Sequence, residues 1–235
     1  MTATLIAPQR LIDPAPHVDR GPRSRVAYRV RLGSAALAVA GLLFVAYPAL
    51  RPFSDESSLQ GAAAFGSTAW LVAHMLAMVG FVLTGLGLLA LHLALQGTPA
   101  ERLSFWALVV GWIGIGLTLP FYGGEAFGLH AIGQRALAEH AAALVSMADD
   151  VRSGPGLVMF LIGLSLLAAS AIVAATGVWR SGRLPGWSGT SFALGFALYI
   201  PQFFGSQPVR VGHGVLVAAG CLLLAVGMWR RGVEE

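Results

Sequence analysis

Long apolar stretches separated by short polar segments dominate the chain. They approach or exceed the roughly 20 residues that a helix needs to cross a bilayer, and they lie at 32–50, 68–95, 103–122, 156–179, 190–204 and 211–229. The fifth is the shortest, with 15 residues, so we expect it to be tilted, to begin at Trp187, or to be re-entrant. The pattern predicts an all-α polytopic membrane helix bundle of about six transmembrane helices, or five if one is re-entrant.

The first segment of the chain differs from the rest. Residues 1–31 are rich in Pro and Arg and contain no apolar core of the signal-peptide type. This composition predicts a disordered, basic cytoplasmic tail. A single transmembrane helical domain is then expected over residues 32–231.

A second distinct segment separates the third and fourth apolar runs. Residues 125–150 carry apolar residues at helical spacing and an oppositely charged pair, Arg135 and Glu139, four positions apart. This predicts one amphipathic helix that lies outside the membrane or folds over the bundle as a lid. Pro120 and the Gly123-Gly124 pair predict a bend or break just before it.

Composition and charge support the membrane assignment. Of the 235 residues, 56% are hydrophobic and only 11% are charged, against about a quarter in an ordinary soluble domain. All fifteen basic residues are Arg, and eleven of them lie in the two terminal segments and in the loops 96–102 and 180–186. The positive-inside rule therefore predicts a multi-pass protein of the inner (plasma) membrane with both termini in the cytoplasm. Topology explains the net charge of +4, so no nucleic-acid partner is expected.

One acid stands out against this background. Glu125 directly follows an apolar run and is surrounded by aromatic residues. A carboxylic acid at a membrane is costly and suggests a functional site, although it could also simply cap the helix that follows. The predicted topology places it in one outer layer with polar residues and with aromatic residues. The polar ones are His74, His130, His213, Tyr199 and Gln202, and the aromatic ones are Trp70, Phe121, Tyr122, Phe127 and Phe203.

Such a layer suits one particular chemistry. A carboxylic acid in apolar surroundings stays protonated and can protonate an alkene, and aromatic faces then stabilise the resulting carbocation. Glu125 is therefore predicted to be the general acid, and one of the three histidines would tune it or accept the final proton. Asp55 and Glu56 are the rival acids. A belt of aromatic residues at the membrane interface is the ordinary alternative for the rings.

Other functions remain open. Histidines on separate helices could bind haem or a metal ion, and the Gly-rich spans would permit the movements of a small-molecule transporter. Against these, the chain has no His-Glu-x-x-His pair and a single cysteine, Cys221. No acid lies within an apolar run. We therefore expect neither a metal ion nor a cofactor, and the expected partners are the lipid bilayer and a hydrophobic substrate.

The chain resembles the small bacterial membrane-embedded terpene cyclases that act on farnesylated indole diketopiperazines of the drimentine type or on related meroterpenoids. The resemblance covers the membrane portion. It rests on overall size, on several short spans, on the lack of an Asp-rich diphosphate motif, and on Tyr-Gly-Gly-Glu-Ala-Phe-Gly-Leu-His at 122–130. It implies a metal-free class II cyclisation of a prenylated substrate, an isomerase-type step in terpenoid biosynthesis. The choice of Glu125 as the acid comes from the residues and not from a family motif.

Overall fold

The computed structural model describes residues 22–234, and the secondary structure in this part of the chain consists of helices joined by short loops, without strands. The helices are α1 (Pro22–Leu50), α2 (Leu59–Phe65), α3 (Thr68–Ala94), α4 (Glu101–Gly123), α5 (Leu129–Ala138), α6 (Met147–Val151), α7 (Gly154–Ser181), α8 (Gly186–Ala197) and α9 (Gln207–Glu234). Short π- or 3₁₀-helical turns are η1 (Gly124–Gly128), η2 (Ala142–Ser146) and η3 (Pro201–Phe204).

Five stretches are long and apolar enough to cross a membrane. They are Arg25–Leu50, Thr68–Ala94, Glu101–Ala138, Gly154–Ser181 and Gln207–Arg230. These helices confirm the predicted all-α bundle and support a multi-pass membrane protein. The predicted boundary of the N-terminal tail was wrong, because α1 begins at Pro22 and residues 22–31 are helical. The rest of that predicted tail lies outside the described residues.

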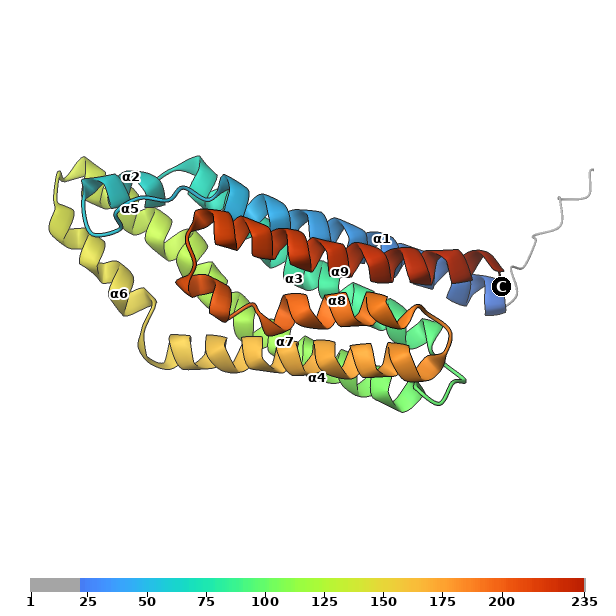
Figure 1. Cartoon of the computed structure of the whole chain (residues 1–235). Helices are drawn as coiled ribbons and strands as arrows, with labels where there is room; N and C mark the ends of the chain where they lie inside the picture. The colour runs from blue at the N-terminus through green and yellow to red at the C-terminus, as the bar shows by residue number, and fades with distance from the viewer. Residues whose placement is uncertain (1–21, 235) are drawn as a thin grey trace, which may run out of the picture.

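The fifth apolar run does not form a long helix. It gives α8, which at 12 residues is about 18 Å long and too short to cross the roughly 30 Å of hydrocarbon, followed by a turn and η3. Pro201 stands at the start of η3 and cannot donate a backbone hydrogen bond, which explains why α8 does not continue through it. The chain still returns along the bundle here, because α8 lies beside α7 and α9 (Figure 1).

Packing of the long helices divides into two groups. Helix α1 packs against α3 and α9, and α7 packs against α4 and α8. The α4–α7 contact is close because Gly114 and Gly163 face each other; a Cβ on Gly114 would lie 2.8 Å from the Gly163 carbonyl oxygen. Ser170 of α7 also donates a hydrogen bond to the Ala107 carbonyl of α4, at 2.6 Å. The bundle is thus held by small residues and by interhelical hydrogen bonds such as this one, as well as by its apolar core.

The chain around Glu125 is continuous, not broken. Helix α4 runs through Pro120 into η1 and then α5, so residues 101–138 form one helical stretch. The π turn accommodates the extra residue: the Leu129 N–H bonds to the Gly124 carbonyl, five residues back. The predicted single helix over 125–150 was also wrong, because α5 ends at Ala138 and the chain turns at His140, where φ is +52°. Within α5, the predicted pair of Arg135 and Glu139 does form, at 2.8 Å.

One end of the bundle carries a small separate unit, which we call the cap and which consists of α2, α5, η2 and α6 (Figure 1). Its own apolar cluster includes Phe65, Leu129, Ala136 and Val145, together with Trp70 at the start of α3. Helices α2 and α5 approach closely at Gly66 and Gly133. The predicted lid segment is therefore packed against α2, which lies between the long helices α1 and α3, and together they close this end of the bundle.

Candidate functional site

Glu125 lies in the π turn, at the junction of bundle and cap. Its residue is only 8% exposed, and its backbone carbonyl accepts a 2.7 Å hydrogen bond from the indole N–H of Trp70. The side chain is turned into the protein. A helix-capping role in contact with bulk water does not fit this placement.

Arg152, which ends α6, binds the Glu125 carboxylate. Its Nε donates to Oε1 at 2.5 Å and its Nη2 to Oε2 at 2.9 Å, a bidentate ion pair. Burial by itself would lower the pKa of Arg152, but the bonds to Glu125 outweigh burial and raise it. A carboxylate makes this arrangement in its charged form, whereas the predicted general acid must be neutral. The proton-donor hypothesis therefore needs a second state of Glu125.

Glu56 joins a second arginine to this pair. Its Oε2 accepts a 2.6 Å bond from Arg152 and its Oε1 accepts a 2.7 Å bond from Arg51. Burial by itself would raise the pKa of the Glu56 carboxyl, but attraction to Arg51 and Arg152 outweighs burial and lowers it. The result is a chain of alternating charges from Arg51 through Glu56 and Arg152 to Glu125, which connects α1, the loop before α2, α6 and the π turn.

His74 of α3 lies on the other side of Glu125. Its Nδ1 bonds to the Trp70 carbonyl at 2.8 Å, so Nδ1 carries the hydrogen and Nε2 points toward the acid. The distance from Nε2 to Glu125 Oε2 is 3.6 Å, just beyond hydrogen-bond range. This buried nitrogen has no hydrogen-bond partner among the described residues. It is the histidine nitrogen in contact with the Glu125 carboxylate, and it lies behind the acid as seen from the cap-end pocket.

The charged chain forms one wall of a cavity of about 620 Å³. The cavity, which we call the cap-end pocket, lies between the ends of α1, α4, α7 and α9. Its charged lining residues are Arg51, Glu56, Glu125, Arg152 and Arg210, and its apolar and aromatic lining includes Phe53, Phe121, Tyr122, Leu157, Phe160, Phe203 and Phe204. The volume lies in the range of small-molecule sites. Its lining fits a ligand with one polar end.

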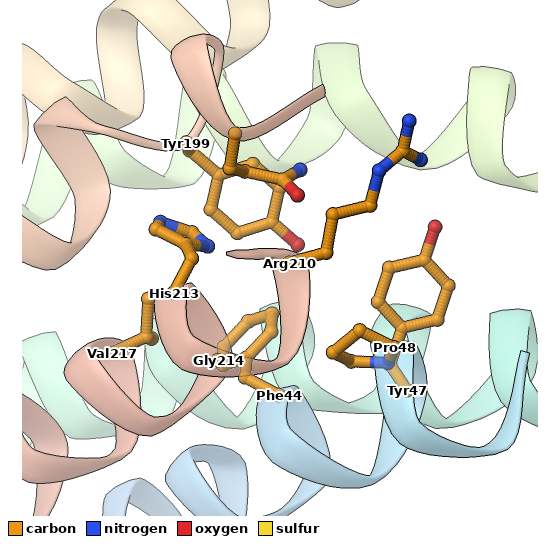
Figure 2. A pocket seen from close by; sticks show the side chains of 9 residues that line it. Phe44, Tyr47, Pro48, Tyr199, Arg210, His213, Gly214 and Val217 are labelled. Carbon is orange, nitrogen blue, oxygen red and sulfur yellow. The ribbon is translucent and has the colours of Figure 1, made fainter. Parts of the chain in front are cut away.

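A second, much smaller cavity of about 10 Å³ adjoins this pocket. Figure 2 shows its lining, with His213 and Tyr199 near each other and Arg210 extending away from them. His213 Nε2 bonds to the Gly195 carbonyl at 2.8 Å, and the Tyr199 hydroxyl bonds to that of Tyr122 at 3.1 Å. This volume is enough for about one water molecule, so it is no substrate site.

The structure brings together only some of the residues that the sequence suggested. Glu125, Phe121, Tyr122 and Phe203 line the cap-end pocket, and Trp70 and His74 support Glu125 from behind. Three others, Tyr199, Gln202 and His213, line the small cavity.

Three of the suggested residues were misplaced. Phe127 is 54% exposed and lines neither cavity, because the π turn rotates it away from the bundle. His130 bonds to the Phe65 carbonyl inside the cap, at 3.1 Å. Asp55 is exposed and accepts hydrogen bonds from Ser57, which lower its pKa, so of the two rival acids only Glu56 reaches the site.

Sequence reasoning missed the arginines of the pocket. Arg51, Arg152 and Arg210 are among the four arginines that lie outside the Arg-rich segments, and all three line the pocket. The signal was present, because a basic residue on the Arg-poor side of a membrane protein needs a local reason. Phe53 and Phe160 gave no comparable signal.

The histidines do not form a metal centre in this structure. His74, His130 and His213 each bond to a different backbone carbonyl. Across residues 22–234, no group of three or more His, Cys, Asp or Glu side chains is arranged to hold a metal ion.

Comparison with known proteins adds no further constraint. No protein-family model, no curated protein and no solved structure matches the chain. The function is therefore argued from the geometry of the cap-end pocket.

Proposed function

We propose that the cap-end pocket binds a prenylated hydrophobic molecule and that the protein cyclises it by a metal-free, protonation-initiated reaction. One observation carries this proposal. A buried carboxylate, Glu125, and a wall of aromatic rings border the same cavity of about 620 Å³. Protonation of the substrate needs the acid, and stabilisation of the carbocation needs the aromatic rings.

The aromatic wall supports the cationic part of the reaction. Phe121 and Phe160 stack with ring centroids 4.1 Å apart, and Phe203 lies 5.8 Å from Phe160. Tyr122 stands edge-on to Phe160 at 5.9 Å. Ring faces attract a cation through their quadrupole and offer it no lone pair to attack, so a carbocation beside them survives long enough to cyclise.

The proton would come from Glu125 in a second state. In that state Arg152 keeps its bond to Glu56, and the protonated Glu125 faces the substrate. The O–H bond breaks as its proton joins a terminal alkene carbon, whose π electrons form the new C–H bond. The next alkene attacks the cation to form a C–C bond, and a final C–H proton returns to the Glu125 carboxylate, which lines the pocket. Because Glu125 gives one proton and takes one back, the sum of these steps is an isomerisation. His74, behind Glu125, would tune the acid.

The ion pair with Arg152 then has a role in the cycle. It stabilises the carboxylate that remains after Glu125 has given up its proton. The observed geometry corresponds to this deprotonated state. Arg51 and Arg152 together neutralise the two acids, Glu56 and Glu125, which lowers the cost of placing these charges beside an apolar ligand.

The test uses purified protein in lipid nanodiscs with a farnesylated indole and a chelator, and mass spectrometry detects a product of unchanged mass. We expect turnover that survives the chelator and falls at least about 100-fold in Glu125→Gln. Glu139→Gln is the matched control, since Glu139 is an exposed acid in the same helical stretch. Undiminished turnover by Glu125→Gln, or no conversion of the prenylated substrate by the wild type, would overturn the proposal.

A second candidate is the binding and transport of an amphiphile without chemistry. The observation that favours it is the charge of the pocket, where three arginines face two glutamates. An excess of guanidinium serves an anionic ligand and is not needed for cyclisation. Ligand-dependent uptake into liposomes, without any isomeric product, would select this function.

We also propose that the cap lies on the outer side of the plasma membrane and both termini in the cytoplasm. The start of α1 and the end of α9 lie together at the end of the bundle opposite the cap (Figure 1). Arg180 and Arg183 lie at that same end, where α7 turns into α8. Arginines concentrate on the cytoplasmic side of such proteins. A reporter enzyme that is active only in the periplasm can be fused after Glu235 to test this orientation. Activity of that reporter would overturn it.

A further inference from the structure

The mouth of the cap-end pocket holds one arginine whose charge is not neutralised. Arg51 pairs with Glu56, and Arg152 pairs with Glu56 and Glu125. Arg210 makes no ion pair with any residue in the described range and donates only to two backbone carbonyls, Phe203 at 2.7 Å and Gly205 at 3.0 Å. The pocket therefore has a local excess of positive charge at a defined position.

Arg210 and Arg51 share a neighbour. The guanidinium carbon of Arg51 lies 4.7 Å from the centroid of the Phe53 ring, and that of Arg210 lies 5.3 Å from the same centroid. Two cations are thus held near one ring, and among residues 22–234 only Arg51 of the two is paired with a carboxylate, that of Glu56, which Arg152 shares. The repulsion between them is relieved when an anion binds between them.

The hydrogen-bond donors of Arg210 are also incompletely used. Its hydrogen bonds engage Nε and Nη2, and Nη1 has no hydrogen-bond partner among residues 22–234. Figure 2 shows the Arg210 guanidinium and the Tyr47 hydroxyl extending to the same side, and both residues line the cap-end pocket. The unused donor therefore belongs to a guanidinium of the pocket lining.

The aromatic rings that lie deeper in the pocket, which we call the aromatic floor, are those of Tyr47, Phe121 and Tyr122. Phe121 and Tyr122 precede Glu125 by about one helical turn, and Tyr47 precedes Arg51 in the same way, so the charged residues lie at the mouth and the rings deeper. The arrangement has a cationic mouth and an apolar floor, the complement of an amphiphile with an anionic head.

We infer that Arg210 and Arg51 bind the phosphate or carboxylate head of an amphiphilic ligand whose apolar body lies against the aromatic floor. The inference rests on the proposed function, because it names the class of molecule that the same pocket takes. It goes beyond that function in assigning a charged head to the ligand and a head-binding role to Arg210.

Binding to the protein in phosphatidylcholine nanodiscs tests it, with farnesyl phosphate, farnesol and inorganic phosphate as probes. We expect the wild type to bind farnesyl phosphate at least about tenfold more tightly than farnesol, the value of one charge-assisted hydrogen bond or more. Arg210→Gln should reduce this preference at least about fivefold, because only Arg51 is then left to bind the head. Arg135→Gln is the control, because Arg135 is an exposed arginine paired with Glu139.

Each result separates the two proposals. Equal affinity for farnesyl phosphate and farnesol, or a preference unchanged in Arg210→Gln, overturns the head-binding site and leaves the pocket intact. If the protein binds neither molecule, the cap-end pocket is not a binding site for prenylated molecules, and the proposed function fails as well. If farnesyl phosphate binding is competed by phosphatidylglycerol in the nanodisc, the anionic head belongs to a membrane lipid; competition by inorganic phosphate alone assigns the site to free phosphate.

A second measurement guards against misfolding, because Arg210 also supports the turn at Phe203 and Gly205. In the wild type, added salt should weaken the binding of farnesyl phosphate and leave that of farnesol unaffected, since screening acts on the charged head. The same salt dependence for both molecules contradicts a head-binding arginine.

Discussion

Arg152 and Glu125 meet as a bidentate ion pair although 27 positions separate them in the chain. The pair joins the π turn after α4 to the segment before α7. Arg152 also binds Glu56, so a single guanidinium connects three parts of the chain at the junction of bundle and cap. Its removal has consequences for stability as well as for the site.

Replacing Arg152 with Leu should destabilise the protein by about 3 kcal/mol, because the buried Glu125 would lose its ion-pair partner and the half-buried Glu56 would keep only Arg51. Chemical unfolding in detergent micelles measures this. Arg135→Leu, which breaks an exposed ion pair on α5, should cost less than about 0.5 kcal/mol. An equal loss of stability in the two variants would show that the buried ion pair contributes no more than the exposed one.

Stability should decline at acidic pH through Glu56. Because Arg51 and Arg152 outweigh burial and lower its pKa below the usual 4.5, the unfolded chain binds the proton more tightly than the folded chain. The contribution is complete above about pH 4.5 and is lost as the pH falls through the folded-state pKa. The unfolding temperature should therefore drop over this range, and the drop should be smaller in Glu56→Gln. The same drop in both proteins would exclude Glu56 as its source.

Gly114 should not tolerate alanine. A Cβ there would lie 2.8 Å from the Gly163 carbonyl oxygen and close to Leu167, so α4 and α7 would have to separate, at a cost of about 1–3 kcal/mol. Gly116 is the matched control two positions along the same helix, since a Cβ there meets nothing within 4 Å. Gly116→Ala should be neutral or stabilising by up to about 1 kcal/mol. Thermal unfolding of the two variants distinguishes them, and a shared response would contradict the close contact.

Of the three histidines in the candidate layer, only His74 should affect turnover of a prenylated substrate. Its Nε2 lies 3.6 Å from Glu125, whereas His130 bonds inside the cap. We expect His74→Gln to slow turnover about tenfold, because Glu125 would lose the imidazole beside it, and His130→Gln to leave turnover unchanged. Equal effects, or none in His74→Gln, would remove the role of His74 in tuning the acid.

Much of the bundle could be predicted because each long helix follows from a continuous run of apolar residues in the sequence. Apolar length alone located the five long helices, although the sequence did not show that α1 starts at Pro22 or that the fifth apolar run forms only the short α8. Helix boundaries depend on which backbone groups find partners, and a hydropathy pattern does not record that. The run at 190–204 is apolar throughout, yet Pro201 limits its helix.

The candidate site was harder to predict for a different reason. Glu125 could be singled out because a carboxylate after an apolar run is rare. Its partner Arg152 lies beyond the whole cap, and nothing in local spacing links the two. The sequence therefore suggested a lone neutral acid, whereas the fold provides it with a cation. Long-range charge pairs of this kind are set by tertiary packing.

The π turn at η1 has a consequence for the phase of the helix. Up to Tyr122, the inward face of α4 points into the pocket; after Gly128, the inward face of α5 packs into the cap. An α-helix advances about 100° per residue. Deleting one residue from 124–128 would therefore restore regular helix and rotate α5 by about that angle relative to α4. The apolar face of α5 would then no longer pack into the cap. One surplus residue in a continuous helix sets both where the acid points and how the bundle is closed.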